Sequence, residues 1–104
     1  MDRVKKLVEM LRDNPDDSFL QHALALEHLK MGEEESARQL FENVLRNDPL
    51  YTGSYYHLAL LYIRTGEKEL ALQTFEKGME ACRQTGDKHA LSELRMAYDD
   101  FAEE

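Results

Sequence analysis

The residues that could carry chemistry are few and scattered along the chain. Cys82 is the single cysteine among 104 residues, which excludes a disulfide framework and a cysteine-based metal cluster within the chain. A nucleophilic thiol needs a neighbouring base and a group that orients it, and no candidate pair stands out near Cys82. We interpret Cys82 as a small, half-buried structural residue. The five glycines are isolated from one another, so the sequence has no glycine-rich phosphate loop.

The histidines lack the spacing of a metal site. They are His22, His28, His57 and His89, no two of them are four residues apart, and no His-Glu-x-x-His motif occurs. His28 falls at a position expected in the core, where we predict a packed ring. His22 and His57 fall on similar faces of successive predicted helices, so adventitious metal binding stays open as an alternative. We predict no catalytic residue, no metal site and no cofactor.

Charge and apolar patterning argue against two classes of partner. The chain has 21 acidic and 13 basic residues, a formal net charge of −8 with neutral histidines. Nucleic-acid-binding domains instead carry basic patches. No apolar run approaches the ~18 residues of a membrane helix. The first residues lead into no signal-type apolar stretch. We expect a cytoplasmic protein that binds neither nucleic acid nor membrane.

Apolar residues recur at helical spacing, which predicts an all-α fold. Val4, Leu7, Val8 and Leu11 follow one stripe of a helix. Turn-forming residues divide the chain into six helices, predicted at residues 2–13, 18–31, 34–47, 52–65, 67–84 and 88–102. The loops are short, so consecutive helices should pack as antiparallel hairpins. Two of the breaks contain Gly32 and Gly66, which we expect in the left-handed conformation that ends a helix.

The second half of the chain repeats the first at an offset of 34 residues. When residues 15–48 are aligned with 49–82, 11 of the 34 pairs are identical. Chance for this composition would give roughly two or three, so the period indicates a helical repeat. The identical pairs include Pro15 with Pro49, Ala25 with Ala59, Gly32 with Gly66, Ala37 with Ala71 and Phe41 with Phe75. Small residues opposite large ones are typical of two closely packed helices.

The residues at these positions resemble the tetratricopeptide repeat family. The second unit reads Tyr55-x-x-Leu58-Ala59-x-x-Tyr62 and then Ala71-x-x-x-Phe75, and the first carries Leu24-Ala25, Ala37-x-x-x-Phe41 and a closing Pro49. The chain is similar to small bacterial members of this family. The resemblance implies a right-handed superhelical stack of antiparallel helix hairpins, with about six helices.

Three positions depart from the family pattern. Gln21 and His28 stand where the family prefers aromatic residues. Arg83 stands where a closing proline is expected, so we predict a longer second helix in that unit. The resemblance still covers nearly the whole chain. We expect a single domain, 1–104, made of a half-repeat helix (1–14), repeat one (15–48), repeat two (49–86) and a capping helix (87–104).

The resemblance implies a function in binding other proteins, without enzymatic activity. In this family the first helices of the units line a concave groove that binds a peptide or helix of a partner. Carried over by position, the predicted groove residues are Phe19, His22, Leu26, Lys30, Tyr56, His57, Leu60, Arg64 and Met96. Slots that hold a terminal carboxylate in chaperone-binding members carry His22, Leu26, His57 and Glu93 here. We therefore expect an amphipathic or hydrophobic segment as the ligand.

Other interpretations stay open at the level of the sequence. Leu26 and Leu60 either form an open groove or pack against neighbouring helices in a shallow solenoid. The runner-up function is a homodimer that self-associates through its end helices and takes no peptide ligand. It rests on apolar faces expected to point outward, which carry Val4, Leu7 and Leu11 at one end and Leu94, Tyr98 and Phe101 at the other. An enzyme would need a second titratable group beside Cys82 or His57 in a deep pocket.

Overall fold

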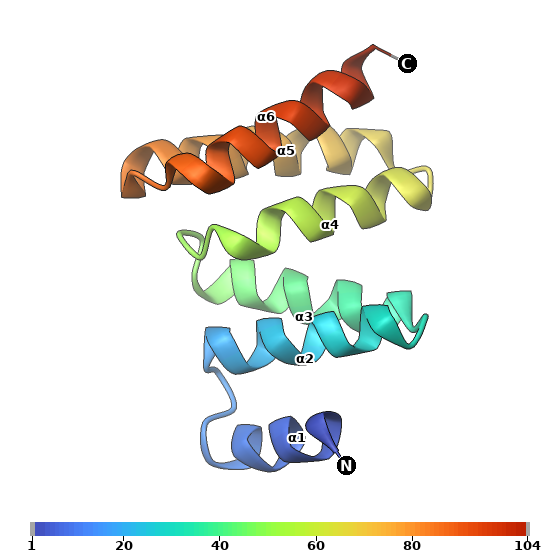
Figure 1. The fold of residues 1–104 in the computed structure, drawn as a ribbon, viewed down its shortest axis with the longest axis vertical. Coiled ribbons are helices and arrows are strands. Elements are labelled where there is room, and N and C mark those ends of the chain that lie inside the picture. The colour runs from blue at the N-terminus through green and yellow to red at the C-terminus, as the bar shows by residue number, and fades with distance from the viewer. Residues whose placement is uncertain (1, 104) are drawn as a thin grey trace. The chain divides into compact units, whose positions relative to one another are not determined.

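The computed structural model describes residues 2–103 and folds them into six α-helices (Figure 1). They are α1 (Arg3–Asp13), α2 (Ser18–Lys30), α3 (Glu34–Asn47), α4 (Gly53–Arg64), α5 (Lys68–Thr85) and α6 (Lys88–Ala102). Each predicted boundary lies within one residue of these bounds, and residues 2–103 contain no strand. The predicted all-α helical repeat is confirmed. None of these helices is long and apolar enough to cross a membrane.

The turns that close the first helix of each repeat are built alike. Gly32 has φ 76° and Gly66 has φ 80°, which confirms the predicted left-handed conformation. The backbone N–H of Glu33 donates to the carbonyl of His28, and that of Glu67 donates to the carbonyl of Tyr62. Both N···O distances are 2.8 Å. Each turn thus satisfies a helix-end carbonyl, and glycine supplies the backbone conformation that this requires.

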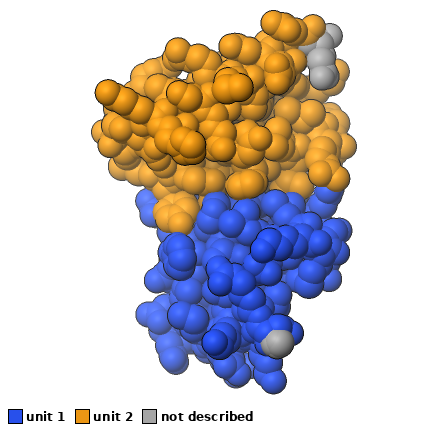
Figure 2. Space-filling model, in the orientation of Figure 1, with its two compact units in different colours: residues 1–48 blue, residues 49–104 orange. Residues whose placement is uncertain are grey.

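The chain forms two compact units, residues 1–48 (unit 1) and 49–104 (unit 2) (Figure 2). In unit 1, α2 packs against α3, and α1 packs against α2. The interface of α2 and α3 buries four side chains that are 0% exposed: Ala25, Ala37, Phe41 and Val44. The two alanines leave room for the large ring of Phe41, as the repeat predicts.

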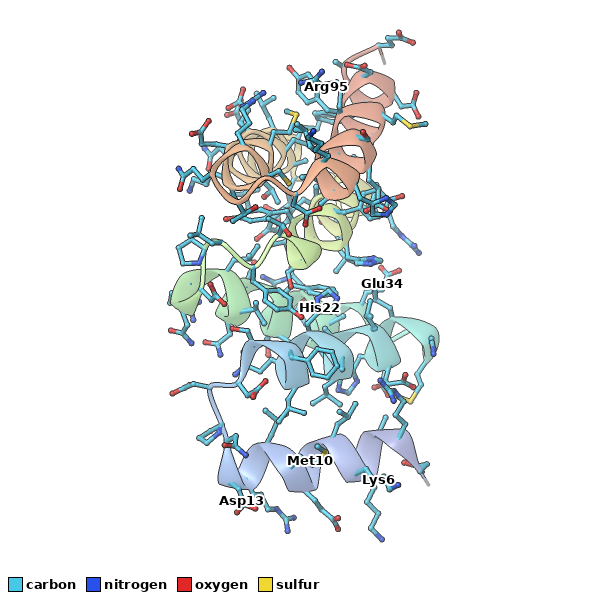
Figure 3. The ribbon with its side chains drawn as sticks, turned by 60° about the vertical axis from the view of Figure 1, so that its left-hand side comes forward. Lys6, Met10, Asp13, His22, Glu34 and Arg95 are labelled. Atoms are coloured by element: carbon cyan, nitrogen blue, oxygen red, sulfur yellow. The ribbon has the colours of Figure 1, made fainter. Side chains whose placement is uncertain are left out.

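Helix α1 turns its apolar stripe toward α2. Leu7 is buried in a cluster with Leu20, Ala23 and Leu24, and Val4 and Leu11 pack against that cluster. Figure 3 shows Lys6 and Asp13 on the side of α1 that faces away from α2. The prediction that Val4, Leu7 and Leu11 form an outward face is therefore wrong. A terminal amphipathic helix buries its stripe on its one neighbour because that removes the most apolar surface from water.

Unit 2 consists of the α4–α5 hairpin with α6 packed against both helices. Ala59, Ala71 and Phe75 are fully buried, as their counterparts in unit 1 are. Helix α5 has 18 residues against 14 in α3, which confirms the predicted longer helix. The additional residues of α5 begin at Cys82, which is buried in this unit.

The end helix α6 also points its apolar residues inward. Leu94 is fully buried. Tyr98 and Phe101 are half-buried, and both rings lie against Phe75, with centroid distances of 5.8 Å in each pair. The prediction of an outward face with Leu94, Tyr98 and Phe101 is wrong for the same reason as in α1. The apolar surface that suggested self-association through the end helices is used inside each unit.

Candidate functional site

Helices α4 and α6 border a groove on the surface of unit 2. Helix α4 contributes Tyr56, Leu60 and Ile63, which share a face because they are separated by four and three residues. Helix α6 contributes residues at positions i, i+3, i+4, i+7 and i+8 of one face: Glu93, Met96, Ala97, Asp100 and Phe101. The groove lined by these eight residues, here called the α4–α6 groove, has a volume of about 390 Å³.

The floor of the groove is apolar and its charged residues have one sign. Met96 is 71% exposed, whereas Leu60, Ile63 and Ala97 are half-buried. The charged residues among the lining side chains are Glu93 and Asp100, both acidic and exposed. A thioether and an aliphatic floor adapt to differently shaped apolar side chains, as methionine-rich binding surfaces do.

His57 lies beside the groove and is held by two neighbours. Its ring makes an edge-to-face contact with Tyr56, with centroids 5.3 Å apart and planes at 78°. Burial lowers the pKa of His57, because the charged imidazolium would lose water, and the nearby carboxylate of Glu93 offsets part of that effect. Burial therefore disfavours a positive charge at this position beside the groove.

The α6 side of the groove is braced from beneath by aromatic contacts. Phe75 of α5 is fully buried and lies 5.8 Å from both Phe101 and Tyr98, measured between ring centroids. The Phe101 ring is tilted by 34° to Phe75 and the Tyr98 ring by 74°. Such pairs contribute roughly 0.5–1.5 kcal/mol beyond the area they bury. They fix the last turns of α6, which carry Asp100 and the groove-lining face of Phe101.

In unit 1 the predicted groove residues lie along α2 in mixed environments. Phe19 is 62% exposed, and His22 and Leu26 are half-buried. The His22 ring contacts the core residue Phe41 edge to face, with centroids 5.5 Å apart. These positions therefore combine an open aromatic side chain with residues that also serve packing.

The predicted basic residue Lys30 is engaged in an ion-pair cluster. Its Nζ lies 3.2 Å from Oε2 of Glu27, and Nε of Arg3 lies 3.1 Å from the same oxygen. The Arg3–Glu27 pair therefore joins α1 to α2, and the Lys30–Glu27 pair lies within α2. Exposed ion pairs of this kind contribute only ~0–1 kcal/mol to stability. Lys30 could therefore leave Glu27 and pair with a carboxylate of a bound ligand at little cost.

The structure brings some of the predicted site residues together and leaves others apart. Tyr56, Leu60 and Met96 line one groove. Arg64, at the end of α4, is exposed and is not among the residues that line it. Ile63, Ala97 and Phe101 line the groove but are missing from the predicted set. Helical periodicity could have found two of them, since Ile63 is three residues after Leu60, and Phe101 is eight residues after Glu93.

The structure defines the surroundings of two residues considered for chemistry, Cys82 and His28. Cys82 is buried, and burial raises the pKa of its thiol, with a smaller contribution in the same direction from Asp87. His28 is half-buried, which corrects the expectation of a ring packed in the core, and its Nδ1 lies 2.6 Å from Oε1 of Glu33. Within residues 2–103, no three or more His, Cys, Asp or Glu side chains are grouped to hold a metal ion.

Comparison with known proteins identifies the family. A family model described as tetratricopeptide repeat matches residues 52–85. The crystal structure of a tetratricopeptide repeat domain protein from Salinibacter ruber is 41% identical in sequence. That match covers 83% of this chain and 96% of the other, with a TM-score of 0.80. The chain belongs to the tetratricopeptide repeat family.

More distant neighbours of this tetratricopeptide repeat protein share the fold. A protein from Bordetella parapertussis is 22% identical, with a TM-score of 0.81 over 99% of this chain and 90% of that one. MamA is 21% identical, with a TM-score of 0.74 over 81% of this chain and 49% of that one. No curated protein sequence gives a significant match. Tetratricopeptide repeats generally serve as non-enzymatic modules for protein–protein interaction, so this fold indicates a function of that class.

Proposed function

We propose that this protein is a non-enzymatic interaction module that binds a peptide or helix of another protein in the α4–α6 groove. The observation that carries the proposal is the groove itself. It exposes Met96 by 71% beside Leu60 and Tyr56. An open apolar groove of this kind is typical of docking sites rather than of ordinary surface.

The chemistry around the groove supports binding more than catalysis. Tyr56 offers a large surface with only two side-chain torsions to order, and it is the residue type enriched at interfaces. The His57 ring makes an edge-to-face contact with the Tyr56 ring. The one thiol, Cys82, is buried and its pKa is raised, which is the opposite of an activated nucleophile.

A pull-down experiment with matched variants as baits tests the proposal. The first two baits are the wild-type chain and the Met96→Asp variant. This substitution changes a side chain that is already 71% exposed, so it leaves the core intact. Leu70→Asp is the matched control, because Leu70 is 39% exposed on α5 and does not line the groove. Circular dichroism establishes that all three proteins are folded.

A protein retained by wild type and Leu70→Asp but lost by Met96→Asp is the expected result. A charged group in the groove floor would then have to be desolvated by the ligand, which abolishes apolar docking. Retention of the same partners by Met96→Asp would overturn the proposal. The predicted groove residues on α2 are tested in the same way with Phe19→Ala, because the Phe19 ring is 62% exposed.

A further inference from the structure

We infer that the α4–α6 groove is occupied by a cationic amphipathic helix of another protein, whose leucine-like side chains enter the groove and whose lysine or arginine side chains pair with Glu93 and Asp100. The inference rests on the proposed function and adds the chemistry of the partner. Both charged residues that line the groove, Glu93 and Asp100, are acidic.

These two carboxylates are available to a ligand. Both side chains are exposed, and within residues 2–103 neither forms a hydrogen bond or ion pair through its side chain. Some carboxylates outside the groove are paired with cations: Glu27 has two, and Glu35 and Glu42 both pair with Arg38. Among the described residues, Glu93 and Asp100 have no such cation, so a ligand that brings two cations would complement the groove.

The end of α6 adds to this negative potential. The last turns of α1 to α5 each carry at least one basic residue, which suits the partial negative charge of a helix C-terminus. The last turn of α6 has none, and Asp99 and Asp100 stand near it. This arrangement is unfavourable for the isolated helix, and a bound cation at Asp100 would relieve it.

The spacing of the two carboxylates suits a helical ligand. Glu93 and Asp100 are seven residues apart on α6, two turns or about 10 Å along the helix axis. Met96 and Ala97 lie between them. A partner helix laid along the groove has the same repeat, so basic residues seven apart can meet both carboxylates while apolar residues at the intervening turn reach the floor.

Three synthetic 16-residue peptides test the inference by titration against the ¹⁵N-labelled full chain. All three carry the same leucines on one helical face, and their flanking positions are lysine, glutamine or glutamate. We expect the lysine peptide to shift groove resonances and to bind about 3- to 30-fold tighter than the glutamine peptide, from two exposed ion pairs. The glutamate peptide should be the weakest.

Variants assign the effect to the two carboxylates. Glu93→Gln with Asp100→Asn should remove the preference for lysine over glutamine, and so should high salt, which screens exposed charges. The control is Glu69→Gln with Glu76→Gln on α5, which changes the net charge equally outside the groove and should keep the preference. Met96→Asp should weaken all three peptides.

The outcomes distinguish failure of the inference from failure of the proposed function. Equal binding of the lysine and glutamine peptides at the groove would overturn the cationic partner and leave the proposed groove function standing. Lysine-peptide binding that survives Met96→Asp would count against both claims, because contact would then be general surface attraction. No binding of any peptide at millimolar concentration would also count against both.

Discussion

The two repeats make the same turn with different side chains. In repeat one, Nε2 of Gln21 donates to the carbonyl of Pro15 at 2.6 Å. In repeat two, the hydroxyl of Tyr55 donates to the carbonyl of Pro49 at 2.6 Å. The residues correspond at the 34-residue offset. The turn before the first helix therefore requires a donor at this position, and an amide serves as well as a phenol.

The choice of donor depends on the residue it packs against. Tyr55 lies over Gly78, where a Cβ atom would come within 2.7 Å of the Tyr55 side chain and 2.9 Å of Leu94 Cδ1. The position equivalent to Gly78 in repeat one is Val44, which is fully buried. A large donor goes with glycine and a smaller donor with valine. The comparison predicts that the two positions are energetically coupled, because a side chain added at Gly78 would meet the ring of Tyr55.

In repeat one, the side chain of Gln21 takes part in a second hydrogen bond. Oε1 of Gln21 accepts a hydrogen bond from Nδ2 of Asn43 at 3.0 Å, which ties α2 to α3. Lys77 occupies the equivalent position in repeat two. The amide of Gln21 is 5% exposed and uses both its ends, so it leaves no buried group unsatisfied.

The largest expected effect comes from emptying the core position that the repeats share. Phe41→Ala and Phe75→Ala should each lower the free energy of unfolding by about 3–5 kcal/mol, because both rings are fully buried. The two losses should be comparable, because the rings occupy equivalent positions of the repeat and both are fully buried. Urea unfolding followed by far-ultraviolet circular dichroism measures both. A loss well below this range for one ring alone would break the equivalence of the two repeats.

The next effect tests the volume exchange between repeats. Gly78→Val should destabilise the protein by about 2–3 kcal/mol through overpacking against Tyr55 and Leu94. Adding Tyr55→Gln should recover part of that loss, with a coupling of roughly 0.5–3 kcal/mol in a double-mutant cycle.

The reciprocal exchange in repeat one serves as the control. Gln21→Tyr should be destabilising beside Val44, and Gln21→Tyr with Val44→Gly should be less so, measured by the same urea unfolding. Additive effects in both cycles would show that the glycine and the tyrosine are unrelated. Coupling in one repeat alone would mean that the surroundings differ more than the alignment suggests.

The sequence predicts most of the fold because its signals are local. Proline, glycine and the spacing of apolar residues fix the helix bounds, and the paired alanines and phenylalanines fix the hairpins. The orientation of the end helices does not follow from the same signals, because a repeat pattern does not say which side of a terminal helix has a neighbour. The pattern therefore predicts Leu94 and Phe101 on an outward face, although Leu94 is in the core and Phe101 lines the α4–α6 groove.

A smaller effect separates the capping residues of the two units. Asp17 accepts a hydrogen bond from the N–H of Leu20 at the start of α2, and Asp87 accepts one from Ala90 at the start of α6. Asp87 also accepts the hydroxyl of Thr52, and these bonds lower its pKa. Asp17→Ala should cost about 1 kcal/mol, and Asp87→Ala up to about 2 kcal/mol.

Thr52→Val isolates the additional contact, because it removes the hydroxyl and keeps the shape. Its cost should account for the difference between the two aspartate variants, measured by urea unfolding at pH 7. Since the pKa of Asp87 is lowered in the folded state, its contribution is present at neutral pH and is lost as the pH falls through that pKa. Equal costs for Asp17→Ala and Asp87→Ala would show that the Thr52 bond adds nothing.

The smallest effect concerns a titratable residue that the first repeat lacks. His57 is half-buried in repeat two, and the equivalent residue in repeat one is the buried Ala23. Burial lowers the pKa of His57, so the unfolded chain binds a proton more readily than the folded one. Stability should therefore decline as the pH falls below about 6.5, the ordinary pKa of histidine.

Urea unfolding at pH 8 and at pH 5.5 measures this decline, and the comparison of variants assigns it to one imidazole. His57→Asn should lose less stability than wild type over this range, because the neutral amide has no proton to gain. His89→Asn, on the exposed side of α6, controls for the removal of any histidine and should follow wild type. A steeper pH dependence in His57→Asn than in wild type would mean that the attraction of Glu93 outweighs burial, and His57 would then be a cation beside the groove.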